Sequence, residues 1–315
     1  MGKIRSAILL LLLLGAAGWC LGPGGGQSVA EETHRVRIAY LPITHALPLF
    51  AEKELLTADD DVQIELIKYG SWPELMDALN TGKVDGASVL IELAVKAREQ
   101  GIDVRAAALG HKEGNVIIGG NDIEKPEDLR GKIFAIPHKQ STHNLLLQQM
   151  LAEQGIKPNE VTVVELSPPE MPAGLAQGQI AGYCVAEPFG AKAIALGKGH
   201  ILARAEELWP DGLCCALVFN GEFADKHHEL ARQTTAKYLA AGQYLTEHAE
   251  EQPQIARLYL KAKAKVVEMS LQLIRYDDLG ITPEAYAELV KRMTAAKLIE
   301  RVPDYEDFVD KSLLP

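Results

Sequence analysis

The sequence predicts an α/β protein of two lobes, and three observations lead to that prediction. Short β-branched runs alternate with amphipathic helical stretches from Arg35 onward, which is typical of βαβ units and of a mainly parallel sheet. The alternation breaks at Gly119-Gly120 and then starts again, so that two α/β halves follow one another. Beyond Cys215 the chain becomes almost entirely helical. We therefore expect two α/β lobes and a helical C-terminal tail.

The first half contains four predicted strands and three predicted helices. Ser71 and Glu74, three residues apart with Pro73 between them, form the pattern of a capping box at the start of the second helix. The predicted strands are 36–41, 61–67, 85–89 and 103–109, and the predicted helices are 46–54, a segment beginning at 71, and 92–100.

The second half repeats the pattern and then changes to helix. Apolar residues recur at helical spacing in 141–154 and along a long stripe between 223 and 245. The predicted elements are a helical turn at 126–129, strands at 132–136, 161–166, 182–185 and 216–219, a helix beginning at 187–188, and a helix at 283–298.

The restart of the alternation predicts where the lobes divide. We expect residues 31–113 and 216–315 to form a discontinuous first lobe and residues 114–215 to form the second. The chain would then cross between the lobes near Glu113 and again near Cys215.

The first thirty residues have the features of a secretory signal. Lys3 and Arg5 precede an apolar run with six consecutive leucines at 9–14, which is too short to span a bilayer as a helix. Small residues at 28–30 offer a cleavage site. We expect segment 1–30 to be removed, leaving an exported protein in the periplasm or at the cell surface.

A lipid anchor at Cys20 is the alternative fate of this segment. Cys20 follows Ala17-Gly18-Trp19, and a lipoprotein is cut directly before such a cysteine. The bulky Trp19 fits that processing poorly, so the sequence favours simple release over lipidation of Cys20.

Charge and cysteine content exclude several classes of partner and fold. The formal charge of −11 becomes two units more negative when the leader is removed, because the leader contains Lys3 and Arg5 but no acidic residue. An acidic chain without a basic block argues against nucleic acid and against an anionic membrane surface. Three cysteines beyond the leader, Cys184, Cys214 and Cys215, are too few for a disulfide framework and leave at least one thiol free.

Candidate ligand-binding residues are those that directly follow the predicted strands. Ligands of open α/β sheets sit beyond the carboxyl ends of the strands, and helix N-termini there favour an anion or a polar oxygen. Two hydroxyls and an imidazole open one helix at Ser141-Thr142-His143. The expected ligand-binding set is Thr44, His45, Trp72, His111, Ser141, Thr142, His143 and Glu187.

Each candidate also has a purely structural interpretation. Ser141 or Thr142 can serve only as an N-cap, and Trp72 can pack between lobes. His45, His111 and His143 could together bind a metal, but no two of them are spaced i, i+4, so we expect no metal site and no cofactor.

At this point the chain resembles a known family. Five segments, in order, are similar to periplasmic solute-binding proteins of the nitrate, sulfonate and bicarbonate branch, which also includes binders of thiamine-pyrimidine precursors. The segments are 41–49, 70–72, 79–87, 141–144 and 182–189.

The resemblance implies a type II periplasmic-binding-protein fold, in which two α/β lobes close on a ligand. It also implies an ABC permease and its ATPase as partners, a monomeric protein, and ligand contacts from Trp72 and His143. Two differences from the nitrate and bicarbonate subgroup leave the identity of the ligand open. Ala186 stands where the nitrate and bicarbonate subgroup has Gly, and 208–212 lacks the Lys of the nitrate binders; a buried anion without a countercharge is costly.

The resemblance leaves three functions to compare. The first is capture of a small polar or anionic molecule, such as nitrate, bicarbonate or a sulfonate, for an ABC importer. The second is binding of a thiamine-pyrimidine precursor or another heterocycle. The third is an enzyme similar to the pyrimidine synthases of this fold. Those synthases have a cysteine-rich loop, and the pair Cys214-Cys215 faintly resembles it. The export signal argues against that synthase, and we expect no enzymatic activity.

Overall fold

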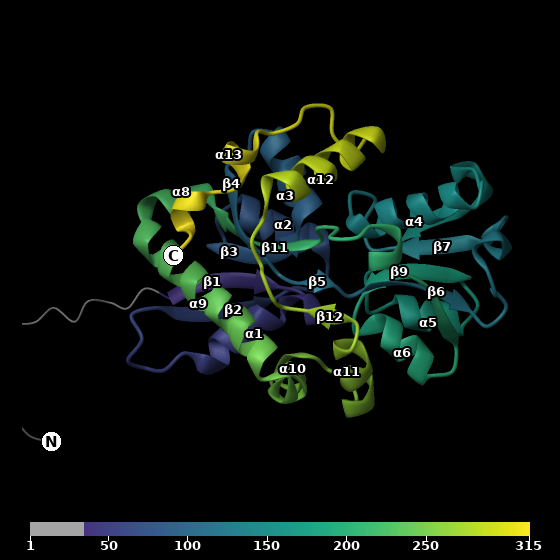
Figure 1. Ribbon diagram of the computed structural model, residues 1–315, viewed down its shortest axis with the longest axis horizontal. Helices are drawn as coiled ribbons and strands as arrows, with labels where there is room; N and C mark the ends of the chain where they lie inside the picture. Colours follow the sequence, from purple (N-terminus) through teal and green to yellow (C-terminus); the bar gives the residue numbers. More distant parts are fainter. Residues whose placement is uncertain (1–34) are drawn as a thin grey trace, which may run out of the picture. The chain divides into compact units, whose positions relative to one another are not determined.

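The structure, a computed structural model, describes residues 35–315 and is organised around two five-stranded sheets (Figure 1). The strand order is β2-β1-β3-β11-β4 in the first sheet and β10-β6-β9-β7-β8 in the second. A small third sheet pairs β5 with β12. The predicted signal segment and Cys20 lie outside the described residues.

The first lobe is built on the first sheet. Its central strands β3 and β11 are buried along their whole length, in keeping with their continuous apolar sequences. The strands are β1 (Arg35–Tyr40), β2 (Gln63–Lys68), β3 (Gly86–Leu90), β4 (Val104–Leu109) and β11 (Cys215–Asn220), and the helices between them are η1 (Thr44–Ala46), α1 (Leu47–Leu55), α2 (Trp72–Asn80) and α3 (Ile91–Glu99).

The second lobe is built on the second sheet, which Figure 1 shows between α4 and the pair α5 and α6. Its strands are β6 (Asn115–Gly120), β7 (Ile133–Ile136), β8 (Thr162–Glu165), β9 (Gly182–Ala186) and β10 (Gly199–Arg204). Its helices are η2 (Pro126–Leu129), α4 (Thr142–Glu153), η3 (Pro158–Glu160), α5 (Met171–Ala176), α6 (Phe189–Ala195) and α7 (Ala205–Leu208).

The C-terminal part is helical, as predicted. The long helix α9 packs against α1, while α11 packs against α6 of the second lobe. The helices are α8 (Gly221–Lys226), α9 (His228–Glu247), η4 (Ala249–Glu251), α10 (Gln252–Tyr259), α11 (Ala264–Leu271), α12 (Pro283–Ala295), α13 (Tyr305–Phe308) and η5 (Lys311–Leu313). The short pair β5 (Lys112–Glu113) and β12 (Ile274–Arg275) joins this part to the chain crossing.

Both sheets are mainly parallel, as predicted, but each contains one strand that runs against the other four. β11 runs antiparallel to β3 and β4, and β6 runs antiparallel to β9 and β10. β11 begins beside the carboxyl end of β4, so it runs in the opposite direction to β4. Sequence alternation alone does not reveal this reversal.

Two strands of the second lobe were missed. Gly119 and Gly120, predicted as a break, are the last residues of β6, and β10 was not predicted at all. A Cβ atom on Gly119 would lie 2.8 Å from Leu202 of β10, so the glycine permits close packing of these strands.

Helix starts were predicted with mixed success. Ser141 caps α4 as expected, since its hydroxyl accepts a hydrogen bond from the Asn144 N–H at 3.3 Å. The capping box at Ser71 is wrong. α2 begins there with Pro73 in its first turn, but the Ser71 side chain makes no capping hydrogen bond.

None of the helices within residues 35–315 is both long enough and apolar enough to cross a bilayer.

A carboxyl group buried in α1 yields a stability prediction. Glu52 is 1% exposed, and neither carboxylate oxygen has a hydrogen-bond partner among the described residues. Burial raises the pKa of Glu52 well above its ordinary value, with a smaller opposing effect of the Lys237 charge. A carboxyl whose pKa is raised by folding stabilises the fold below its unfolded-state pKa. That stability is lost as the pH rises towards the folded-state pKa.

Replacing Glu52 by Met should therefore stabilise the protein at pH 8 by about 1–3 kcal/mol, the desolvation penalty of an unpaired buried polar group. It should also reduce the fall in stability between pH 5 and pH 8. Thermal unfolding at the two pH values measures both effects. Glu268→Met, at an exposed helical position, is the control and should change neither. A lower melting temperature of Glu52→Met at pH 8 would contradict the prediction.

Candidate functional site

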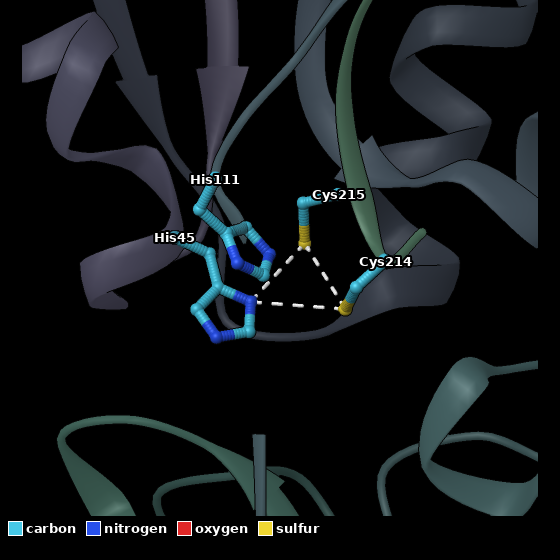
Figure 2. A group of neighbouring side chains, drawn as sticks. All are labelled: His45, His111, Cys214 and Cys215. Atoms are coloured by element: carbon cyan, nitrogen blue, oxygen red, sulfur yellow. Dashed lines mark hydrogen bonds between the residues drawn. The ribbon is translucent and has the colours of Figure 1, made fainter. Parts of the chain in front are cut away.

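Four side chains that can bind a metal meet at the carboxyl ends of the parallel strands of the first sheet (Figure 2). His45 lies in η1, just beyond the end of β1, and His111 follows the end of β4. Cys214 precedes β11, and Cys215 is its first residue. Because β11 is antiparallel to β3 and β4, its start lies at the same edge as the ends of β1 and β4. This is the edge at which open α/β sheets bind ligands.

A glycine allows these segments to approach one another. A Cβ atom on Gly110 would lie 2.7 Å from the His45 carbonyl oxygen and 3.3 Å from the Cys215 Cβ atom. The first distance is shorter than real Cβ atoms show, and the second is tighter than most Cβ contacts. Gly110 therefore lets the end of β4 pass close to η1 and β11, which places His111 beside His45. The two imidazole rings have centroids 3.5 Å apart.

The distances within the cluster match those of a tetrahedral zinc site. The two Sγ atoms are 3.8 Å apart, and Nδ1 of His45 lies 3.5 Å from Sγ of Cys215 and 3.7 Å from Sγ of Cys214. Tetrahedral Zn²⁺ with ordinary bond lengths separates two sulfurs by about 3.8 Å, and a sulfur from a nitrogen by about 3.6 Å. The ligand atoms of all four residues lie within 4.8 Å of one another.

The outer atoms of the imidazole rings are held by the backbone. Nε2 of His45 is 3.2 Å from the Gly114 carbonyl oxygen, and Nδ1 of His111 is 2.7 Å from the Glu113 carbonyl oxygen. An N–H donated to each carbonyl leaves Nδ1 of His45 and Nε2 of His111 as free lone pairs. Nε2 of His111 has no hydrogen-bond partner among the described residues. Metal-binding histidines are commonly oriented in this way.

Burial controls the protonation of the cluster. It lowers the pKa of His111 to about 4, with the His45 charge acting in the same direction, so this imidazole is neutral. Burial alone would raise the pKa of Cys214, but the Cys215 thiol, 3.8 Å away, and the neighbouring imidazoles outweigh it and hold that pKa well below its ordinary value. Burial and the neighbouring Cys214 raise the pKa of Cys215. Cys214 therefore loses its proton more readily than Cys215, and the adjacent His111 is neutral.

The polar surroundings of the cluster are suited to a cation. Within residues 35–315, its hydrogen bonds involve imidazoles, thiols, the Asn115 side chain and backbone carbonyls, and no Lys or Arg side chain. Each of the four residues is at most 3% exposed. A buried anion here would lack a countercharge, whereas a divalent cation would gain at least one thiolate.

The predicted residues at the start of α4 lie at the junction of the lobes. The Thr142 hydroxyl oxygen is 2.7 Å from the Leu213 carbonyl oxygen and also contacts the Glu92 carboxyl. A hydroxyl has one proton, so it donates to Leu213 and accepts from a protonated Glu92. Burial raises the pKa of Glu92 well above its ordinary value, in agreement with this assignment. His143 is fully buried, and neither of its ring nitrogens has a hydrogen-bond partner within the described chain.

Thr44 and Glu187, also predicted as ligand contacts, bond to each other across the lobes. The N–H and hydroxyl of Thr44 donate to the Glu187 carbonyl oxygen at 2.9 Å and 3.0 Å. The Glu187 carboxyl accepts from the Ala191 N–H at the start of α6, and burial raises its pKa to about 7. Their place in the ligand site stays a prediction.

Trp72 lies at a separate place between the lobes. Its ring is 2% exposed, and its Nε1 has no hydrogen-bond partner among the described residues. It lines a cavity of about 310 Å³ together with Pro137 and His138 of the second lobe. A ligand role for Trp72 stays a prediction, but the ring is placed to respond to movement between the lobes.

One cavity reaches the cluster. It has a volume of about 430 Å³ and is lined by His111, which is the one member of the cluster that contributes to its wall. The acidic side chains of Glu113, Asp211 and Glu284 also line it. The basic side chains of Lys112 and Arg275 line it as well.

Cys214 and Cys215 were not among the predicted site residues. The cluster draws on three segments that are far apart in the chain, so no local ligand spacing marks it. The available signal was that a vicinal cysteine pair lies at the start of a strand, while two of the candidate histidines follow strands.

Comparison with known proteins agrees with the fold. The chain belongs to the NMT1-like family, which matches residues 29–260. It is similar to the crystal structure of a ligand-binding component of an ABC-type import system from Staphylococcus aureus with zinc bound, at 40% identity and a TM-score of 0.85. That match covers 89% of this chain and 97% of the other. The type II periplasmic-binding-protein fold and the family resemblance are thus confirmed.

Curated relatives are solute-binding proteins of importers and related proteins. The chain is 28% identical to the nitrate/nitrite binding protein NrtA of Nostoc sp., over 82% of this chain and 66% of the relative. It is 30% identical to the taurine-binding periplasmic protein of Escherichia coli, over 62% of each. The chain spans two thirds or less of the length of these curated relatives.

Proposed function

We propose that this chain is the solute-binding component of an ABC importer and that its solute is a zinc ion. His45, His111, Cys214 and Cys215 would bind the ion. The observation that carries the proposal is the set of distances between three donor atoms, 3.5, 3.7 and 3.8 Å, which are those of a tetrahedral zinc site.

The donor set favours zinc over other common cations. Thiolate and imidazole ligands suit Zn²⁺ and Cu⁺, whereas Ca²⁺ and Mg²⁺ take oxygen ligands. The lowered pKa values of His111 and Cys214 also let a metal bind without first displacing many protons. The zinc-bound S. aureus relative supports the same choice.

The same features argue against the oxyanion ligands that the resemblance suggested. Nitrate, bicarbonate or a sulfonate would be buried beside a thiolate without a Lys or Arg side chain from the described residues. Burial of an unpaired charge costs several kcal/mol. The geometry thus favours a metal ion over a small anion or a heterocycle.

Partners and location follow from the family. Relatives of this chain include proteins named as nitrate import and bicarbonate transport ATP-binding proteins. We infer a permease and an ATPase as partners, export through the leader 1–30, and no enzymatic activity. The lobe boundaries near Glu113 and Cys215 belong to the same proposal.

Metal titration of the reduced, mature protein tests this function. One Zn²⁺ should bind per chain, Co²⁺ should give the intense visible and thiolate charge-transfer bands of a tetrahedral site with sulfur ligands, and Ca²⁺ and Mg²⁺ should not compete. Nitrate, bicarbonate, taurine and a pyrimidine are titrated in parallel. Absence of zinc binding, binding of Cu⁺ in clear preference to Zn²⁺, or tight binding of one of the metal-free compounds would overturn the zinc assignment.

A further inference from the structure

A cavity of about 570 Å³ lies where α10 is followed by α11, and no member of the metal cluster lines it. Its wall combines the ends of two neighbouring strands with the end of α10 and the connection that follows it. Tyr40 ends β1 and Lys68 ends β2, and the two residues are paired in the sheet. The rest of the lining is the segment 257–263. α10 itself packs against α1 and α11 (Figure 1).

The charged side chains that line this cavity are all cations. They are Lys68, Arg257, Lys261 and Lys263, and no carboxylate lines the cavity. The chain as a whole has 43 acidic and 32 basic side chains, so these four depart from its average. All four are exposed, and none forms an ion pair within the described residues. The acidic net charge argued against an anionic membrane surface, but exposed charges more than about 8 Å apart are largely screened at physiological ionic strength. The local potential is therefore positive.

An exposed leucine adjoins these cations. Leu258 is 61% exposed, the largest value among the exposed large apolar side chains of the described residues. Its neighbour Tyr259 is anchored, because its ring stacks on Phe50 with centroids 4.4 Å apart and its hydroxyl donates to the Glu54 carboxyl. A cluster of basic residues beside an exposed apolar side chain is the pattern of a surface that binds to a membrane without spanning it.

We propose that Leu258 and the four cations form a basic surface that binds the phosphate headgroups of anionic phospholipids. The cations would contact headgroup phosphates, and Leu258 would enter the boundary between headgroups and acyl chains. A free phosphate ion would engage the cations but make no use of the exposed leucine, so the surface favours a lipid over a soluble phosphate. This inference goes beyond solute binding and does not depend on the zinc site. The basic surface would hold the exported protein against the membrane that contains its permease.

Co-sedimentation of the mature protein with lipid vesicles tests the proposal. The protein should bind vesicles that contain phosphatidylglycerol and phosphatidylcholine in equal parts, but not vesicles of phosphatidylcholine alone. High salt should release it, because screening weakens contacts between exposed charges. Lys261→Glu combined with Lys263→Glu should weaken binding by about 30-fold or more, since each cation near an anionic surface accounts for about fivefold in affinity.

Each substitution has a matched control elsewhere on the surface. Lys83→Glu combined with Lys297→Glu makes the same change in net charge at two exposed lysines that do not line the cavity, and it should leave vesicle binding almost unchanged. Leu258→Ser should weaken binding about three- to tenfold through loss of apolar contact with the lipid. Leu196→Ser, at a side chain that is 54% exposed on the second lobe, should have no effect.

Three results would overturn the proposal. The first is failure of the wild-type protein to bind the anionic vesicles. The second is an equal loss of binding from the two double charge reversals, which would show a dependence on net charge alone. The third is saturable binding of inorganic phosphate in calorimetry without vesicle binding, which would show a site for a soluble anion. Zinc affinity should be the same in the wild type and in Lys261→Glu/Lys263→Glu, so that failure of the zinc assignment and failure of the membrane surface are distinguishable.

Discussion

Replacing Cys214 by serine should reduce zinc affinity by about a hundredfold or more. Structural zinc sites with four protein ligands contribute about 10–16 kcal/mol, so one ligand accounts for an average of about 3 kcal/mol, which corresponds to about two orders of magnitude. Cys214 is also the thiol whose pKa is held low by its neighbours, and serine does not supply an equivalent anion. Chelator competition under reducing conditions measures the loss.

The third buried cysteine is the control for this experiment. Cys184 lies in β9 of the second lobe, is fully buried, and is not a member of the cluster. Cys184→Ser should leave zinc affinity unchanged, although the buried hydroxyl will lower the melting temperature of the apo protein. If Cys184→Ser and Cys214→Ser weakened zinc binding equally, the loss would come from destabilisation of the fold and not from removal of a ligand.

Zinc binding near pH 7.5 should release about one proton per metal ion. The metal binds the thiolate forms of both cysteines. The low pKa of Cys214 means that its proton is already absent, whereas the raised pKa of Cys215 means that its proton must leave. Since protons and zinc compete for Cys215, the affinity should fall about tenfold for each unit by which the pH is lowered. His111, with a pKa of about 4, should add to this dependence only at much lower pH.

Calorimetry in buffers of different ionisation enthalpy counts the released protons. Cys215→Ser removes the titrating thiol and should bind zinc weakly with almost no proton release, whereas Cys184→Ser should still release one. Release of two protons by the wild type would show that both thiols are protonated in the apo protein. No release by the wild type would show that Cys215 is not a ligand.

Much of the fold could be predicted because local patterns determine it. The strand at 36–41 and the helix at 141–154 correspond to β1 and α4, since a short β-branched run and a Ser cap are properties of short segments. The direction of β11 and the existence of β6 and β10 were not predictable in this way. They depend on where the chain re-enters a sheet, which no local periodicity records.

The site, like the fold, contains some features that local sequence predicts and others that only the tertiary structure sets. His45 and His111 of the cluster were among the predicted candidates because ligands gather beyond the ends of strands, whereas ligand roles for Thr44 and His143 stay predictions. Cys214 was not among them, because it precedes a strand, and the relevant edge is shared only when that strand runs antiparallel to its neighbours. The expectation of no metal rested on the absence of i, i+4 spacing, which says nothing about ligands brought together by separate strands.

The sequence by itself determined the two-lobed α/β class, the family and the presence of histidines at strand ends, because these follow from composition, short-range pattern and ordered motifs. The tertiary structure alone decided that His45, His111, Cys214 and Cys215 share one buried space. The physical reason is that Gly110 allows three strand ends to meet at contact distance. The identity of the donor atoms is local, but the distances that select a metal are set by the packing of segments more than a hundred residues apart.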